Sequence, residues 1–267
     1  MIKKNDTYKN MELNYKRSGV GEPLIILHGL FGMLDNWQSI ANFFATSFEV
    51  FNIDLRNHGK SPHDEIHNYQ VMARDIYEFL QDQNIFNTNI IGHSMGGMAA
   101  MQFAAIYPGW VKKLVVVDIF PKKYQPKEKA DHLEILKAAG IIEKSAFKDI
   151  KTVQDVLYSY ITDKRTYMFM LKNLIRKKDG TIGIKFNQKA IADNYSSLLE
   201  SIEFTEPVNV PTLFLKGEKS NYISEKDFEG VGKYFTNAKM ISIPEAGHWI
   251  HVDAPEVFKA EVWDFLK

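Results

Sequence analysis

Cysteine is absent from the 267 residues, which excludes disulfides, thiolate metal sites and a cysteine nucleophile. Net charge is also missing, because 33 lysines and arginines balance 33 aspartates and glutamates, so no overall field favours nucleic acid or an anionic membrane. No stretch approaches the roughly 18 consecutive apolar residues of a membrane-spanning helix. The basic first ten residues lack the apolar core of a signal peptide. We therefore expect a cytoplasmic protein with neither a nucleic-acid partner nor a membrane span.

The composition is that of a soluble globular protein. Apolar residues make up 45% of the chain and aromatic residues 13%, which is enough to bury a sizeable core in one large domain or two small ones. Local basic clusters such as "KRSG" and "IRKKDG" are typical of a solvated surface. Nothing in the sequence decides between a monomer and a dimer.

Short strand-like runs alternate with helical patterns along much of the chain. Each run has four to six apolar or β-branched residues and is closed by glycine, proline or a polar turn. The runs are "PLIILHG", "EVFNIDL", "TNIIGHS", "KLVVVDI", "PTLFLKG" and "KMISIP". Because these strands are apolar throughout and are separated by helices, we predict an α/β fold with a mostly parallel sheet covered on both faces.

Three helices stand out between and after the strands. Residues 69–82 place apolar side chains on one face, and Asn68 is available as the N-cap. Residues 94–106 form a nearly uninterrupted run of small and apolar residues that ends before Pro108. The last segment, "APEVFKAEVWDFL", repeats apolar residues at helical spacing, and we expect it to pack on the sheet.

The alternation fails between about residues 120 and 206, where we recognise helical pieces and a turn at "KKDGTIG" but no convincing strand. An insertion of this length is too long for a simple crossover between two strands. We interpret it as a helical cap over residues 120–206, inserted into a core domain formed by residues 1–119 and 207–267.

The clearest chemical motif is "GHSMG", residues 92–96, between a predicted strand and a predicted helix. In such a nucleophile elbow the turn is so tight that only very small residues fit two positions before and after the serine, and Gly92 and Gly96 meet that demand. The turn lifts Ser94 to the N-terminus of a helix, whose dipole favours developing negative charge. Ser94 is therefore the predicted nucleophile.

A serine hydroxyl needs a base, and eight histidines compete for that role. His248 is favoured because it follows the last predicted strand, precedes the last helix and comes after the nucleophile in chain order. His251 is the alternative. His93 adjoins Ser94 but should point away from it, and His28, at the end of a strand, is expected to brace the adjacent loop.

The glycine-flanked turn "LHGLFG", residues 27–32, can expose backbone N–H groups to an oxyanion. We predict an oxyanion hole made by the backbone N–H groups of Met95, directly after the nucleophile, and Leu30. Phe31 is the nearby alternative to Leu30.

Taken together, "HGLFG", "DLRNHGKSP", "GHSMGG", "VVVDI" and "AGHWIHVDAPE" resemble the α/β-hydrolase fold superfamily over nearly the whole chain. The Arg-Asn-His-Gly stretch, with Asn57 where most relatives carry glycine, looks like the small serine esterases typified by bacterial YbfF and the animal abhydrolase-domain-11 protein. The resemblance implies hydrolysis of carboxylic esters without a metal or an organic cofactor. For Asp54, Arg56 and His58 we expect a role in holding the loop rather than in catalysis.

The resemblance also bears on the triad acid. Many α/β-hydrolases place this carboxylate three residues after the glycine that ends the strand "TLFLKG", where this chain has Ser220. YbfF-like esterases instead use an aspartate in a Val-Asp-Ile segment, which corresponds to Asp118 here. An aspartate that ends an apolar strand is costly unless it is paired or marks a site. We therefore predict Asp118 as the acid, Glu218 as the alternative, and Ser220 and Asn221 as supporting groups.

The substrate is harder to predict. We expect Phe31, His93 and Trp249 to border it, and an apolar acyl pocket is plausible because the cap is rich in apolar and aromatic residues. Most of these should form the cap's own core; they are Phe120, Tyr124, Tyr158, Tyr160, Tyr167, Met168, Phe169 and Met170.

The predicted function is a carboxylesterase for short-to-medium acyl esters. Thioesterases, lactonases, C–C bond hydrolases and cofactor-free haloperoxidase-like enzymes share the fold and triad, so they remain alternatives. Dehalogenases and epoxide hydrolases fit less well because they carry an aspartate at the position of Ser94. A ligand-sensing protein with slow turnover is an alternative from a different class.

Overall fold

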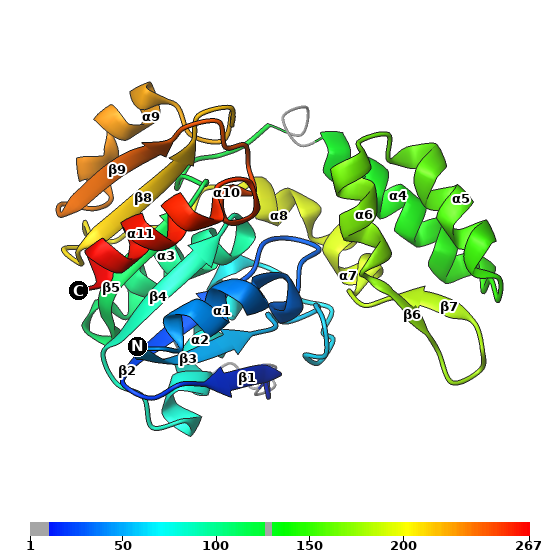
Figure 1. Cartoon of the computed structure of the whole chain (residues 1–267), viewed down its shortest axis with the longest axis horizontal. Coiled ribbons are helices and arrows are strands. Elements are labelled where there is room, and N and C mark those ends of the chain that lie inside the picture. The colour runs from blue at the N-terminus through cyan, green and yellow to red at the C-terminus, as the bar shows by residue number, and fades with distance from the viewer. Residues whose placement is uncertain (1–10, 126–129) are drawn as a thin grey trace.

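The computed structural model describes residues 11–125 and 130–267, so the signal-peptide argument, which depends on residues 1–10, lies outside the described residues. The central sheet has seven strands in the spatial order β1-β3-β2-β4-β5-β8-β9 (Figure 1). All neighbours pair in parallel except β1, which runs antiparallel to β3. The strands are β1 (Tyr15–Ser18), β2 (Glu22–Leu27), β3 (Phe48–Ile53), β4 (Thr88–His93), β5 (Val111–Val117), β8 (Thr212–Gly217) and β9 (Ala238–Ile243).

Helices cover both faces of this sheet, as predicted. Successive side chains of a strand point to opposite faces, so Leu24 and Ile26 enter one hydrophobic cluster while Ile25 and Leu27 enter another. The first cluster lies under α1 (Gln38–Phe44) and α11 (Pro255–Leu266), and the second under α2 (Tyr69–Asp82) and α3 (Met95–Ile106) (Figure 1). The short helices are η1 (Leu34–Trp37), η2 (Pro108–Trp110), α9 (Glu225–Glu229), η4 (Val231–Lys233) and α10 (Ile250–Asp253).

The segment between β5 and β8 is mainly helical and extends to one side of the sheet (Figure 1). The prediction that it contains no strand is wrong, because β6 (Leu174–Arg176) and β7 (Ile182–Ile184) form an antiparallel hairpin. The turn expected at "KKDGTIG" connects them, and Gly180 takes the left-handed φ of 85° there. Three-residue strands are too short to show an alternating pattern. The helices are α4 (Ala130–Ser145), α5 (Ile150–Tyr160), α6 (Lys164–Leu171), α7 (Gln188–Asp193) and α8 (Tyr195–Leu199).

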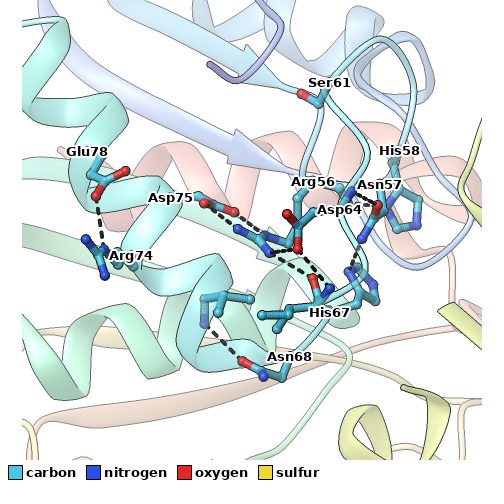
Figure 2. A network of polar contacts seen from close by, with 12 residues as sticks. Arg56, Asn57, His58, Ser61, Asp64, His67, Asn68, Arg74, Asp75 and Glu78 are labelled. Carbon is cyan, nitrogen blue, oxygen red and sulfur yellow. Dashed lines mark hydrogen bonds and ion pairs between the residues drawn. The ribbon is translucent and has the colours of Figure 1, made fainter. Parts of the chain in front are cut away.

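The loop after β3 is held by a buried ion pair (Figure 2). The guanidinium of Arg56 donates to both carboxylate oxygens of Asp75 on α2, at 2.5 and 2.8 Å, and both side chains are almost fully buried. His58 contacts the carbonyl oxygen of Arg56 through Nδ1 at 2.9 Å, and Asp54 accepts from the backbone N–H of Leu34 at 2.7 Å. These contacts confirm the loop-holding role expected of Asp54, Arg56 and His58.

The same loop also contacts the segment between β5 and β8. Asn57 has a φ of 65°, a conformation that asparagine tolerates better than most residues. Its carbonyl oxygen accepts from the N–H of Asn187 at 2.8 Å, and its side-chain oxygen accepts from the Asn187 side chain at 3.1 Å. Tyr69 donates to the carbonyl of Leu198 at 2.8 Å. These hydrogen bonds connect the start of α7 to the loop after β3 and the end of α8 to the first residue of α2.

None of the helices in residues 11–125 and 130–267 combines the length and the apolar character needed to cross a membrane.

Candidate active site

Ser94 lies in the tight turn between β4 and α3. Its backbone angles are φ 51° and ψ −116°, a strained conformation for a residue other than glycine. A Cβ atom on Gly92 would lie 2.5 Å from the carbonyl oxygen of Gly96, and one on Gly96 would lie 2.5 Å from the carbonyl oxygen of Leu27. Both glycines are therefore required by close backbone approach, and the strain at Ser94 is enforced by the packing around it.

The sheet register brings Ser94 and Asp118 to neighbouring strand ends. The N–H of Ser94 donates to the carbonyl of Val117 at 3.0 Å, which extends the β4–β5 ladder by one residue. The N–H of Asp118 donates in turn to Leu215 of β8 at 2.8 Å. Because carboxyl ends of parallel strands meet at one edge, these residues lie at the edge where α/β proteins bind ligands.

Asp118 contacts His248, which lies in the loop between β9 and α10. The Nδ1 atom of His248 is 2.8 Å from Oδ2 of Asp118. The same Oδ2 accepts a short hydrogen bond from the hydroxyl of Ser220, and Oδ1 accepts from the N–H of Gly217 at 2.9 Å. The Asp118 side chain is fully buried, so its charge is compensated by these hydrogen bonds. A carboxylate in this position fixes the imidazole tautomer that leaves Nε2 free of its proton.

The alternatives to Asp118 lie elsewhere. Glu218 is exposed, and its carboxylate accepts from the backbone N–H of Glu245 at 2.9 Å. Asn221 is also exposed, whereas Ser220 is buried against Asp118. Of the two residues expected to support the acid, Ser220 is therefore the one in position to do so.

Three other histidines surround the site as buried, neutral groups. His93 contacts the carbonyl oxygen of His248 through Nε2 at 2.9 Å, and burial lowers its pKa to about 3. His251 stacks on Trp37 with ring centroids 3.9 Å apart, and burial puts its pKa well below the usual value. His28 contacts the carbonyl oxygen of Gly29 in the adjacent loop through Nδ1 at 2.8 Å and accepts from the N–H of Leu55 at 3.0 Å, which confirms its expected bracing role.

The turn after β2 contains the two candidate oxyanion donors, the backbone N–H groups of Leu30 and Phe31. The N–H of Phe31, the alternative oxyanion donor, lies 3.2 Å from Nε2 of His58 and so already has an acceptor. Leu30, Ser94 and Met95 line one small cavity, so both predicted oxyanion donors border the same space as the predicted nucleophile. Asn173, at the end of α6, donates to the carbonyl of Phe31 at 3.0 Å and holds the turn from the other side.

Two larger adjoining cavities open onto this region. One of about 250 Å³ is bordered by Ser94 and His248, and by the predicted substrate contacts Phe31, His93 and Trp249. The other, of about 550 Å³, shares His93 and Trp249 with the first and extends beneath α6. The second volume falls in the range of small-molecule sites.

Few of the aromatic and methionine residues of the 120–206 segment border these cavities. Met168 and Phe169 of α6 line the larger cavity, and Tyr124 lines the small one beside Leu30. Phe120 and Met170 are buried in the hydrophobic core, while Tyr158 is exposed. The expectation that most of this set forms the cap's own core is therefore wrong, because only three of the eight residues are buried and one of these, Phe120, packs against Phe214 of β8.

Sequence reasoning missed three residues at the site. The ring of Tyr222 lies on the imidazole of His248, Asn173 holds the turn of Phe31, and Arg165 of α6 pairs with Asp253 of α10. Tyr222 could have been noticed, because it follows the predicted support Ser220 by two residues. Asn173 and Arg165 act across 142 and 88 residues of sequence, and no local pattern marks such contacts.

Comparison with known proteins agrees with this architecture. Residues 22–145 match the family model described as "alpha/beta hydrolase fold". The chain is 35% identical over 259 residues to the sn-1-specific diacylglycerol lipase ABHD11 of Xenopus tropicalis, covering 95% of this chain and 80% of that protein. It is 32% identical over 244 residues to esterase YbfF of Escherichia coli, covering 91% and 92% of the two chains.

A solved structure entitled "Marine microorganism esterase" is 45% identical to this chain and superposes with a TM-score of 0.91. The match covers 96% of this chain and 99% of that one. With the sheet order, the nucleophile elbow and these relatives in agreement, the chain belongs to the α/β-hydrolase fold family, as the sequence motifs predicted.

Proposed function

We propose that this protein is a carboxylesterase that hydrolyses short-to-medium acyl esters through an acyl-enzyme on Ser94. The observation that carries the proposal is the 2.8 Å contact between Asp118 and His248, beside a cavity that Ser94 also borders. The relatives named as esterases and lipases support the same class of reaction.

The mechanism assigns one role to each group. His248 takes the proton of Ser94 through Nε2 as the hydroxyl oxygen attacks the ester carbonyl, and Asp118 stabilises the imidazolium that forms. The N–H groups of Leu30 and Met95 bind the oxyanion of the tetrahedral intermediate. His248 then donates its proton to the leaving alcohol. Water, activated by the same imidazole, attacks the acyl-enzyme and regenerates Ser94.

The choice of esters over other acyl compounds rests on the relatives and on the cavities. The name of the frog protein specifies sn-1 acyl groups of diacylglycerol, whereas those of the bacterial and marine proteins specify only an esterase. Cavities of about 250 and 550 Å³ provide room for a small acyl group and a larger alcohol, or the reverse. Acylglycerols and thioesters therefore belong in the substrate panel together with simple esters.

The test compares Ser94→Ala with Ser159→Ala, which removes an exposed hydroxyl from α5. We expect Ser94→Ala to abolish hydrolysis of p-nitrophenyl acetate and butyrate and to prevent labelling by a fluorophosphonate, while Ser159→Ala retains both. Thermal unfolding monitored by circular dichroism checks that both variants fold. Unchanged hydrolysis by Ser94→Ala would exclude the proposed nucleophile.

The same proposal includes the division of the chain. We infer that residues 120–206 form a cap on a core made of residues 1–119 and 207–267. Supporting this, α6 contributes Met168 and Phe169 to the larger cavity, and Asn187 is hydrogen-bonded to the loop after β3. The cytoplasmic location stays a prediction from the sequence.

A further inference from the structure

Tyr222 lies flat on the imidazole of His248. The two ring centroids are 3.7 Å apart and the ring planes differ by only 20°. Hydrogen bonds fix the backbone of Tyr222 on both sides, because its N–H donates to the Ser220 hydroxyl at 3.3 Å and its carbonyl accepts from Tyr124 at 2.9 Å. The backbone that carries the ring is therefore held by contacts that do not involve the imidazole.

The hydrogen bonds of Asp118 leave room for a second group to stabilise a charged His248. Oδ2 of Asp118 accepts from both Ser220 and His248, and Oδ1 accepts from Gly217, so the carboxylate does not serve the imidazole alone. Burial keeps the phenol of Tyr222 neutral by raising its pKa above the usual value. The ring face of a neutral phenol carries partial negative charge and attracts a cation stacked upon it.

Other titratable groups lie around this imidazole on several elements. His93 and His251 are buried and uncharged, with lowered pKa values. From α6, Arg165 borders the cavity and pairs with Asp253 of α10, whose carboxylate also accepts from the N–H of Gly247. From α4, Asp131 and His132 line the same cavity, and the charge of Asp131 contributes to the raised pKa of Tyr222.

We propose that Tyr222 is a positioning residue for the hydrolysis, whose ring face stabilises the imidazolium of His248 as that cation forms in the transition state. This inference rests on the proposed function. It gives the loop of residues 217–222 two roles: Ser220 donates a hydrogen bond to Asp118, and Tyr222 stacks on His248. From the usual strength of a cation–π contact we expect the ring to be worth about 2- to 30-fold in kcat/KM.

The experiment compares Tyr222→Phe, which keeps the ring, with Tyr222→Leu, which removes it. We expect Tyr222→Phe to retain most of the activity and Tyr222→Leu to lose about 2- to 30-fold in kcat/KM for p-nitrophenyl butyrate. Without the ring the imidazolium is less stable, so the acidic limb of the pH profile of kcat/KM should move to lower pH. The rate of inactivation by a fluorophosphonate should show the same shift, and this readout does not depend on an ester substrate.

Two further variants separate the charge effect from packing. Tetrafluorophenylalanine incorporated at position 222 keeps the shape of phenylalanine but withdraws electron density from the ring face, so it should behave like Tyr222→Leu. Tyr158→Leu removes an exposed ring of α5 that borders none of the three cavities described above, and it should leave the position of the acidic limb unchanged. If Tyr222→Leu does not fold, the comparison of phenylalanine with its fluorinated analogue at position 222 still tests the proposal.

A fluorinated ring that performs as well as phenylalanine would overturn the proposal, and so would an acidic limb that moves to higher pH in Tyr222→Leu. Failure of the proposed function looks different. In that case Ser94→Ala would keep its activity, whereas failure of this inference leaves Ser94→Ala inactive and only the Tyr222 variants unchanged.

Discussion

Mild acid should destabilise this protein, because it buries histidines in their neutral form. Burial lowers the pKa of His67 and His93 to about 3, and that of His28, His58 and His251 below the usual value. In the unfolded chain each imidazole has a pKa of about 6.5. Between these values the unfolded state binds more protons than the folded state. The free energy of unfolding therefore falls as the pH drops below about 6.5.

The size of the effect follows from the pKa values of about 3 for His67 and His93. At pH 5, which is about 1.5 units below the unfolded pKa, each neutral histidine costs about 2 kcal/mol of stability. His67 and His93 together should therefore remove about 4 kcal/mol between pH 7.5 and pH 5. The other three histidines act in the same direction. Against a typical total stability of about 5–15 kcal/mol, this is a large loss.

Urea unfolding at pH 7.5, 6 and 5, followed by circular dichroism, measures this loss. His67→Gln should reduce the pH dependence by up to one proton bound on unfolding, while His63→Gln, which alters an exposed histidine, should change it less. A free energy of unfolding that stays constant from pH 7.5 to pH 5, or rises toward acid, would show that the buried histidines are protonated in the folded state.

Two further predictions concern charged groups. Asp118→Asn should lower kcat for p-nitrophenyl butyrate by about 10⁴-fold, because the amide favours the wrong imidazole tautomer. The control Glu218→Gln should change kcat little. A large loss of kcat only in Glu218→Gln would reverse the proposed assignment of the acid. Asp75→Asn should cost about 3–5 kcal/mol in urea unfolding by removing the buried counter-charge of Arg56, whose other ion pair, with the partly exposed Asp64, is longer at 3.7 Å. Its control Glu78→Gln, on the same helix, breaks a partly exposed pair with Arg74 and should cost only about 0.3–0.5 kcal/mol. Equal losses in the two variants would contradict this reasoning.

How much the sequence could reveal depended on whether a feature is local. The elbow around Ser94 is defined by five consecutive residues, and the core strands are apolar runs, so both were recognisable without a structure. The predicted N-cap of α2 was also local, and Asn68 does accept from the N–H of Val71 at 3.0 Å. The hairpin of β6 and β7 was not predicted because its strands have only three residues each and pair with one another rather than with the central sheet.

The prediction of the acid rested partly on a local signal in the sequence and partly on the resemblance to a family. An aspartate at the end of an apolar strand was a visible anomaly, but choosing Asp118 over Glu218 required the resemblance to known esterases. The contact of Tyr222 with His248 depends on how the loop after β8 folds back toward the loop after β9. The bond between Asn173 and Phe31 depends on where α6 is placed against the sheet. Neither relation leaves a pattern in the chain, because both are set by tertiary packing.

The neighbouring positions of β5 and β8 are compatible with the proposal that the acid lies at the end of β5. The N–H of Asp118 is paired with Leu215, so a carboxylate at the end of β5 lies next to the loop that begins at the end of β8. Ser220, three residues after the glycine that ends β8, donates its hydroxyl to Asp118. Ser220→Asp would place a second carboxylate against the first in a buried site, where two like charges cannot both stay ionised. A neutral hydroxyl donor at position 220 therefore suits an ionised aspartate at the end of β5 better than a second carboxylate does.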